Sequence, residues 1–257
     1  MINKWVAEKT NNKITEIVSA DAVDALTRLV LVNAVYFKGD WLKMFNVNST
    51  RDEDFHVSQN ESVNVKMMHL KSKFNYGVNA KLHCQAIELP YAGENLSMFI
   101  LLPDQAVTSL SEVEEKLTSD DLVNIMEKFQ MSSVKVKLWL PRFKLDEKLS
   151  LSKMLAAMGM SDLFKPGVAD LTGIDGSKEL YVSHVVHRAV VEVNEEGTEA
   201  AAATAVVMQF RSAVIRNIIF RANHPFLFFI QDKATRSILF FGRLVKPPPA
   251  AAAKAEL

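Results

Sequence analysis

Two kinds of hydrophobic pattern along the chain predict β-strands. Residues 29–37 form a β-branched apolar run that ends at Lys38-Gly39-Asp40. Such a run is typical of a central strand covered on both faces, so we expect it deep in a sheet. Residues 134–140 instead begin with apolar and charged residues in alternation and end at Pro141. That alternation predicts a strand with one face in solvent.

Further apolar segments predict a third strand, a hairpin and a helix. Residues 96–102 form another apolar strand. The apolar runs 225–230 and 238–244 flank a polar connection, which predicts a buried hairpin. A helical pattern ends at Gly159, a residue type that commonly ends helices. The members of this helical pattern, which we expect to fill the core, are Leu151, Met154, Leu155 and Met158.

The helical and strand patterns mix without a strict βαβ alternation, which indicates an α+β fold rather than a doubly wound parallel sheet. The 257 residues, 49% of them hydrophobic, suffice to bury the core of one large domain. We predict a folded domain over residues 1–247 and a disordered Ala/Pro tail over residues 248–257. Residues 1–6 enter an amphipathic pattern without a helix cap, so we expect the N-terminal portion of the fold to be lacking.

Composition argues against several classes of partner. The 30 basic residues balance 30 acidic ones, so no overall field favours nucleic acid or an acidic membrane surface. No apolar run reaches the length of a membrane span, which predicts a soluble protein. Cys84 is the only cysteine, so no internal disulfide can form. Because no motif surrounds this thiol, we interpret Cys84 as a buried residue that packs in the core.

The sequence contains no recognisable catalytic or metal-binding motif. It has no Gly-x-Ser-x-Gly turn, no phosphate-binding glycine loop and no cysteines at zinc spacing. His184 and His187 would point to opposite faces of a strand, which argues against joint metal binding. Adjacent carboxylates such as Asp120 and Asp121 are interpreted as solvated charge. We therefore expect neither an enzyme nor a bound cofactor or metal.

The segment from Glu195 to Val207 is unusual because a glycine is followed by a tract of alanine and threonine. Alanine is the best helix former and Thr198 can cap a helix, so a short surface helix is one interpretation. As a strand, the segment would have one face of uncharged small or apolar side chains from Thr198 to Met208, and Glu199 on the other face. Such a segment suits both an exposed loop and an inserted strand, because the face to be buried is small and uncharged.

Four short motifs occur along the chain in an order that matches one known family. They are Glu-Glu-Gly-Thr followed after one residue by small residues and Thr (195–204), Ala-Asn-His-Pro-Phe-Leu-Phe (222–228), Phe-Gly-Arg (241–243) and Val-Asn-Ala-Val-Tyr-Phe-Lys-Gly-Asp-Trp (32–41). This set resembles the serpin family of serine protease inhibitors. The resemblance extends from about residue 2 to residue 247, and it implies the α+β serpin fold without its N-terminal portion.

The resemblance implies an exposed reactive-centre loop at about residues 195–220. In serpins a protease attacks this loop as a substrate, and the freed hinge then inserts as a new strand in the main sheet and distorts the acyl-enzyme. The family's loop length places the scissile bond between Arg211 and Ser212. A guanidinium there suits a trypsin-like protease, whose specificity pocket holds a carboxylate. Phe210 would serve a chymotrypsin-like enzyme if the register moved by one residue, and Arg216 is a second basic site.

Further residues match functional positions of the family. Glu195 and Arg142 match residues that form an ion pair where the loop enters the sheet, the alternative being two unpaired surface charges. Asn33 and His187 would form a buried polar cluster between neighbouring strands, the alternative being a satisfied core asparagine. Trp41 matches a tryptophan at the breach of the sheet. The predicted hinge residues are Glu195, Glu196, Gly197, Thr198, Glu199, Ala200, Ala201, Ala202, Ala203 and Thr204.

The resemblance leaves alternatives for function. A non-inhibitory serpin, acting as a carrier, chaperone or storage protein, would share the fold, and an inactive truncated serpin is a further alternative. The small-residue hinge favours an inhibitor. We expect a monomer that forms a covalent acyl complex with a trypsin-like serine protease. The sequence identifies neither the target protease nor a glycosaminoglycan activator.

Three acceptor sequons favour glycosylation and secretion. They begin at Asn48, Asn60 and Asn95. We therefore predict a glycoprotein of the extracellular space, with a cytoplasmic location as the alternative.

Overall fold

The computed structural model describes most of the chain as two compact units. One unit contains Met1–Lys38 and Lys144–Glu192, and the other contains Gly39–Phe143 and Val193–Leu257. The described residues are 1–19, 22–128, 132–197 and 218–250. Each unit has its own sheet and its own hydrophobic cluster.

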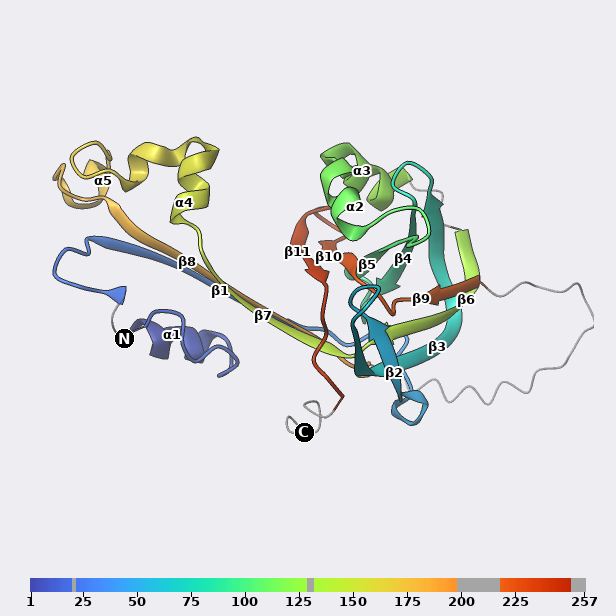
Figure 1. Cartoon of the computed structure of the whole chain (residues 1–257). Coiled ribbons are helices and arrows are strands. Elements are labelled where there is room, and N and C mark those ends of the chain that lie inside the picture. Colours follow the sequence, from blue (N-terminus) through green and yellow to red (C-terminus); the bar gives the residue numbers. More distant parts are fainter. Residues whose placement is uncertain (20–21, 129–131, 198–217, 251–257) are drawn as a thin grey trace, which may run out of the picture. The chain divides into compact units, whose positions relative to one another are not determined.

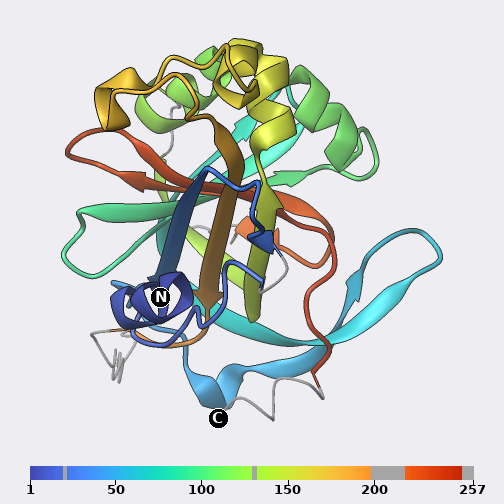
Figure 2. The same cartoon turned by 90° about the vertical axis from the view of Figure 1, so that its left-hand side faces the viewer.

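The first unit is built on a sheet of three long strands, β1 (Leu29–Lys38), β8 (Val182–Val193) and β7 (Phe143–Ser150), in the order β1-β8-β7. The strands lie side by side in Figure 2. β1 and β8 run parallel, with a register from Leu29 opposite Val182 to Lys38 opposite Glu192. The N-terminal helix α1 (Ile2–Lys9) contributes Val6 to the cluster that covers one face of this sheet.

Strand β1 confirms the strand predicted over residues 29–37, but its predicted place deep in a sheet is wrong. Within the described residues β1 is an edge strand, since only β8 pairs with it. One face, including Val30 and Val32, packs on the apolar cluster, whereas Leu31 on the other face is 42% exposed. An apolar run shows that a strand tolerates burial, but neighbouring elements decide whether it is buried.

Short helical turns follow β7 and replace the predicted core helix. Met154 and Met158 are 51% and 80% exposed, so the prediction that these methionines fill the core is wrong. Gly159 has a φ of 105°, which favours glycine and breaks the helical geometry there. The predicted end of the helical pattern at Gly159 is thus confirmed, although the turns before it leave both methionines exposed. The short elements are α4 (Ser152–Leu155), η4 (Ala156–Met160), η5 (Ser161–Phe164) and α5 (Thr172–Asp175).

The second unit holds an eight-stranded sheet system in which β2 pairs with β3 and the other strands follow the order β11-β10-β5-β4-β3-β6-β9 (Figure 1). Its strands are β2 (Arg51–His56), β3 (Ser62–Asn79), β4 (Cys84–Pro90), β5 (Leu96–Pro103), β6 (Ser132–Pro141), β9 (Ile218–Arg221), β10 (Phe226–Asp232) and β11 (Ile238–Leu244). Its helical turns are η2 (Val47–Ser49), α2 (Leu110–Lys116), α3 (Ser119–Val123) and η3 (Asn124–Lys128).

The strands of the second unit confirm the predictions for residues 96–102 and 134–140 and the hairpin. In β6 the alternate residues Val136 and Leu138 are fully buried, as expected for a strand with one wet face. β10 is buried and pairs antiparallel with β11, but Phe241 on β11 is 50% exposed, so only one strand of the hairpin is buried. Phe99 stacks on Phe229 with ring centroids 4.8 Å apart in the cluster that α2 covers.

Cys84 lies buried at the start of β4, as predicted for a packing residue. Burial raises the pKa of its thiol to about 12. Among the described residues, no helix is long and apolar enough to cross a lipid bilayer.

Candidate functional site

The start of the predicted hinge lies against the segment that follows β1. The backbone N–H of Trp41 donates to the carbonyl of Glu196 at 3.0 Å, and that of Phe45 donates to the carbonyl of Glu195 at 3.1 Å. The indole Nε1–H of Trp41 donates to the carbonyl of Asn194 at 2.8 Å. These three bonds fix the direction in which the chain leaves β8.

Trp41 is buried and packed between two aromatic rings in this arrangement. Its side chain is 2% exposed, and its ring stacks on Tyr91 with centroids 4.4 Å apart. Phe45 meets the indole edge-on at 6.2 Å. Such ring pairs add stability beyond the area that they bury. The sequence identified Trp41 from the serpin resemblance, but no local signal indicated Phe45 or Tyr91 as its partners.

Gly197 lies too close to the neighbouring backbone for any side chain. A Cβ at this position would lie 2.6 Å from the carbonyl oxygen of Trp41 and 2.7 Å from Cβ of Met44. The glycine forms a parallel bridge with Trp41 at the last described residue before the gap. The close approach of two backbones therefore explains why glycine stands here.

Glu195 is buried, and its side-chain partner differs from the one predicted. The hydroxyl of Thr50 donates to Oε1 of Glu195 at 2.7 Å. Arg142 makes no ion pair with Glu195 in the described part of the chain, so the predicted pair is wrong for this conformation. The backbone N–H of Arg142 instead donates to the carbonyl of Lys66. The partner of the Glu195 carboxylate is thus the hydroxyl of Thr50, at the end of the turn η2. In the sequence, Thr50 stood out only as part of a sequon.

Asn33 and His187 lie opposite each other on the parallel strands β1 and β8. Nδ1–H of His187 donates to Oδ1 of Asn33 at 2.9 Å, because an amide oxygen can only accept. The structure therefore brings the two predicted residues together. Asn33 is exposed and His187 is half-buried, so the prediction that the pair is buried is wrong in the described residues. The edge position of β1 explains this exposure.

The remaining hinge and reactive-bond predictions lie outside the described residues. They concern Thr198, Glu199, Ala200, Ala201, Ala202, Ala203, Thr204, Arg211 and Ser212. These assignments stay predictions.

The three sequon asparagines are all exposed. The serine or threonine of two of the sequons is already hydrogen-bonded within the protein. Ser97 of the third sequon is fully buried and donates to Glu88, and Thr50 of the first donates to Glu195. Asn60 lies in the exposed turn between β2 and β3 and is the most open of the three sequons. Glycosylation stays a prediction.

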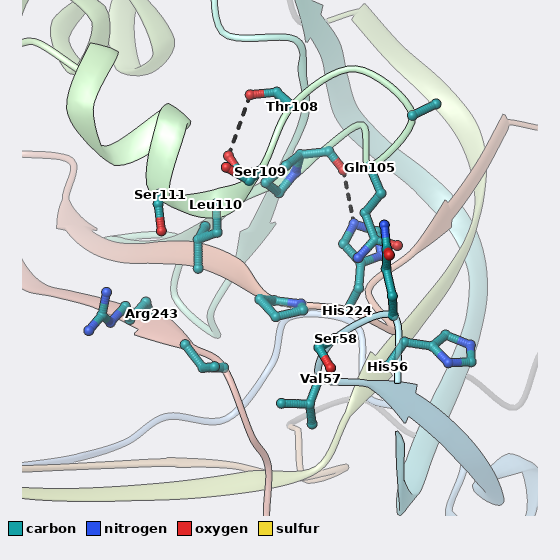
Figure 3. Close-up of a pocket in the computed structure, with 15 residues that line it drawn as sticks. His56, Val57, Ser58, Gln105, Thr108, Ser109, Leu110, Ser111, His224 and Arg243 are labelled. Carbon is teal, nitrogen blue, oxygen red and sulfur yellow. Dashed lines mark hydrogen bonds between the residues drawn. The ribbon is translucent and has the colours of Figure 1, made fainter. Parts of the chain in front are cut away.

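A cavity of about 800 Å³ in the second unit is a separate concave feature (Figure 3). In it, Nε2–H of His224 donates to the carbonyl of Pro103 at 2.9 Å, and burial lowers the pKa of this imidazole. Arg243 is paired with Glu114 on α2. His224 and Arg243 of the cavity thus bind other parts of the protein.

Comparison with known proteins identifies the family. The family model described as "Serpin (serine protease inhibitor)" matches residues 1–247. Over 249 residues the chain is 47% identical to leukocyte elastase inhibitor of Xenopus tropicalis, covering 96% of this chain and 65% of that protein. It is 48% identical to Serpin B6 of Macaca fascicularis over 248 residues, with the same shares covered. The chain thus spans about 65% of the length of these relatives.

The solved structures agree with the sequence comparison. Uncleaved ovalbumin matches with a TM-score of 0.85 and 38% identity over 96% of this chain and 61% of its own. Maspin matches with a TM-score of 0.85 and 29% identity over 96% of this chain and 65% of its own. The names of these relatives give no support to an extracellular location, which stays a prediction. The family model, the relatives and the fold agree, and the chain belongs to the serpin family.

Proposed function

We propose that the protein containing this chain inhibits serine proteases as a suicide substrate. The observation that carries the proposal is the hinge itself. The carbonyls of residues 194–196 accept hydrogen bonds from Trp41 and Phe45, and the tract of small residues that follows Gly197 has the composition of a strand that can be buried on one face. The leukocyte elastase inhibitors among the relatives support inhibition as the activity.

The arrangement of β1 and β8 supports insertion of the hinge between them. A chain that turns back after β8 runs antiparallel to β8, and also to β1, because those two strands are parallel. An inserted strand would replace one parallel ladder by two antiparallel ladders, which are slightly more stable per residue. The existing β1–β8 ladder must separate first. That separation also breaks the side-chain bond between Asn33 and His187 and the contacts of Tyr36 and Lys38 with Glu192, each of which opposes it only weakly.

The identity of the scissile residue decides which protease is trapped. We propose Arg211-Ser212 as the reactive bond, with a trypsin-like enzyme as the target. The relatives named for elastase suggest a different target, because elastase has a small specificity pocket that excludes a guanidinium. Arginine at this position therefore predicts that the protein differs in target from those relatives.

The test uses the whole natural protein, incubated separately with trypsin and with leukocyte elastase. We expect a detergent-stable complex with trypsin and a C-terminal peptide that starts at Ser212. A complex with elastase alone, or a peptide starting elsewhere, would refute the specificity. Cleavage by both enzymes without any complex would identify a substrate and refute inhibition. Thr198→Arg serves as a matched variant, because a charge on the face to be buried should convert the inhibitor into a substrate.

A further inference from the structure

Three exposed methionines lie close together in the sequence of the first unit. Met154, Met158 and Met160 are 51%, 80% and 48% exposed. They belong to the short helical turns α4 and η4 that follow β7, in the yellow region labelled α4 in Figure 1. We call these three residues the methionine cluster. Methionine is among the residues most often fully buried in folded proteins, so three exposed neighbours need a physical reason.

Packing does not supply that reason. None of the three methionines is a member of the apolar cluster that covers β1 and β8. A Cβ built at Gly159, between Met158 and Met160, would meet no atom beyond its chain neighbours within 4 Å, so the turn is open there. Apolar side chains exposed singly are ordinary on a protein surface, but three neighbours on an open turn are not. The sulfur atoms of the methionine cluster are thus accessible to a ligand from solution.

The backbone brings the three side chains within reach of one another. Met154 and Met158 are four residues apart on helical backbone, so they lie on one side of the turn with Cβ atoms ~5–6 Å apart. Gly159 then takes a φ of 105°, and Met160 follows directly. Two residues of chain span at most ~7 Å, which keeps the Cα of Met160 within that distance of the Cα of Met158. Because a methionine side chain has three rotatable bonds, the three sulfur atoms can converge on one ion.

The donor atoms decide which ion fits. Soft thioether sulfur selects copper(I), whereas carboxylate and carbonyl oxygens suit magnesium, calcium and manganese. The nearby carboxylate of Asp162 is paired with Lys165 at 2.9 Å, and the adjacent Lys153 repels a divalent ion twice as strongly as a monovalent one. Within the described ranges, no group of three or more His, Cys, Asp or Glu side chains could hold a metal ion. The methionine cluster therefore suits a soft monovalent cation and is not part of a harder metal site.

We propose that the methionine cluster binds one copper(I) ion through its three thioether sulfurs. The ion binds as copper(I) and keeps its oxidation state, so no electron is transferred. The expectation that the chain binds no metal rests on the spacing of cysteines and histidines and on methionines that fill the core. The second premise is wrong, as the exposed fractions of these side chains show. The site lies wholly in the first unit, and its occupancy does not depend on the proposed inhibition.

The test is a titration of the whole protein with silver(I), a soft monovalent ion that air does not oxidise. Isotope labels on the methionine methyl groups give one magnetic resonance signal for each methionine, and single substitutions by leucine assign the signals. The buffer contains no chloride. We expect the signals of Met154, Met158 and Met160 to shift together and to saturate at about one equivalent of silver(I). Because each signal reports one methionine, silver(I) bound by the Cys84 thiol is not mistaken for binding at the methionine cluster.

Met158→Leu removes one sulfur and nearly conserves the volume of an exposed side chain, so the fold should be unaffected. We expect silver(I) affinity, measured in competition with N-acetylmethionine, to fall at least ~10-fold, because even the outer partners of a metal site change affinity by about 10–100-fold. Met158→Cys should restore binding, since a thiolate is also a soft ligand. Met126→Leu in the second unit is the matched control and should leave the affinity unchanged.

Copper(I) added without oxygen should displace silver(I), and zinc(II) should not. Oxidation of the three methionines to sulfoxides by hydrogen peroxide should abolish binding, because the thioether donors are lost. Any of four results would overturn the proposal: methyl signals of the methionine cluster that do not move, unchanged affinity in Met158→Leu, displacement by an equal concentration of zinc(II), or binding that survives full oxidation. Because the titration contains no protease, its failure leaves the inhibition proposal intact.

Discussion

Substitution of Gly197 by alanine tests whether the hinge is held where the structure places it. The new Cβ would lie 2.6 Å from the carbonyl oxygen of Trp41 and 2.7 Å from Cβ of Met44. Ordinary contacts between such atoms are ~3.5 Å, so the backbones must move apart by roughly 1 Å. Overpacking of this kind costs about 1–3 kcal/mol.

The cost has an upper limit because the hinge can detach instead. Detachment breaks the three bonds that Trp41 and Phe45 donate to residues 194–196, at about 1 kcal/mol each. We therefore expect a loss of ~2 kcal/mol. The backbone amide of Trp41, which donates to Glu196, should then exchange its hydrogen ~30-fold faster.

Hydrogen exchange followed by mass spectrometry measures this change on the peptide that contains Trp41. Gly173→Ala is the control, because a Cβ added at Gly173 in α5 would have no atom within 4 Å and the φ of this glycine is not positive. Alanine there should leave exchange at Trp41 unchanged and stabilise the helix by ~0.5–1 kcal/mol. Equal exchange at Trp41 in the Gly197→Ala variant and the unchanged protein would refute the described hinge contact.

Three further outcomes are expected. His187→Ala removes the bond to Asn33 and should lower stability by ~1 kcal/mol and promote polymers; an unchanged melting curve and native gel would contradict this role. Burial alone would raise the pKa of Glu88, but hydrogen bonds from Lys233 and two uncharged side chains outweigh it and hold the pKa below its usual value. A carboxyl group whose pKa is lower in the folded than in the unfolded state stabilises the fold at pH values above its unfolded-state pKa, and this stabilisation is lost as the pH falls through its folded-state pKa. Glu88→Gln should therefore lower the free energy of unfolding at pH 7 and leave it equal to that of the unchanged protein at strongly acidic pH. Urea titrations at the two pH values measure this. The thiol of Cys84 should react with a disulfide reagent only on unfolding, and rapid reaction of the native protein would refute its burial.

Local patterns in the sequence were sufficient for most strands and for the family. The alternation in residues 134–140 and the apolar run 96–102 each specify a strand without reference to any distant residue, and both are present. The motifs around Trp41 and in the hinge identified the family because each is a short run of consecutive residues that can be recognised without knowledge of the fold. The same local reasoning predicted the break in helical geometry at Gly159 but failed for Met154 and Met158, which are exposed, because helical spacing alone does not show which elements cover that face.

The sequence by itself determined the strand-forming segments, the hinge glycine and the serpin family, since these depend on periodicity and contiguous residues. Only the tertiary structure decided what depends on distant neighbours. Thr50 rather than Arg142 binds Glu195, because a turn far away in the chain brings its hydroxyl within 2.7 Å. Lys71 and Lys73 likewise lie directly opposite Lys137 and Lys135 only through the β3–β6 register, since a shift by one residue would turn one strand's lysines to the opposite face.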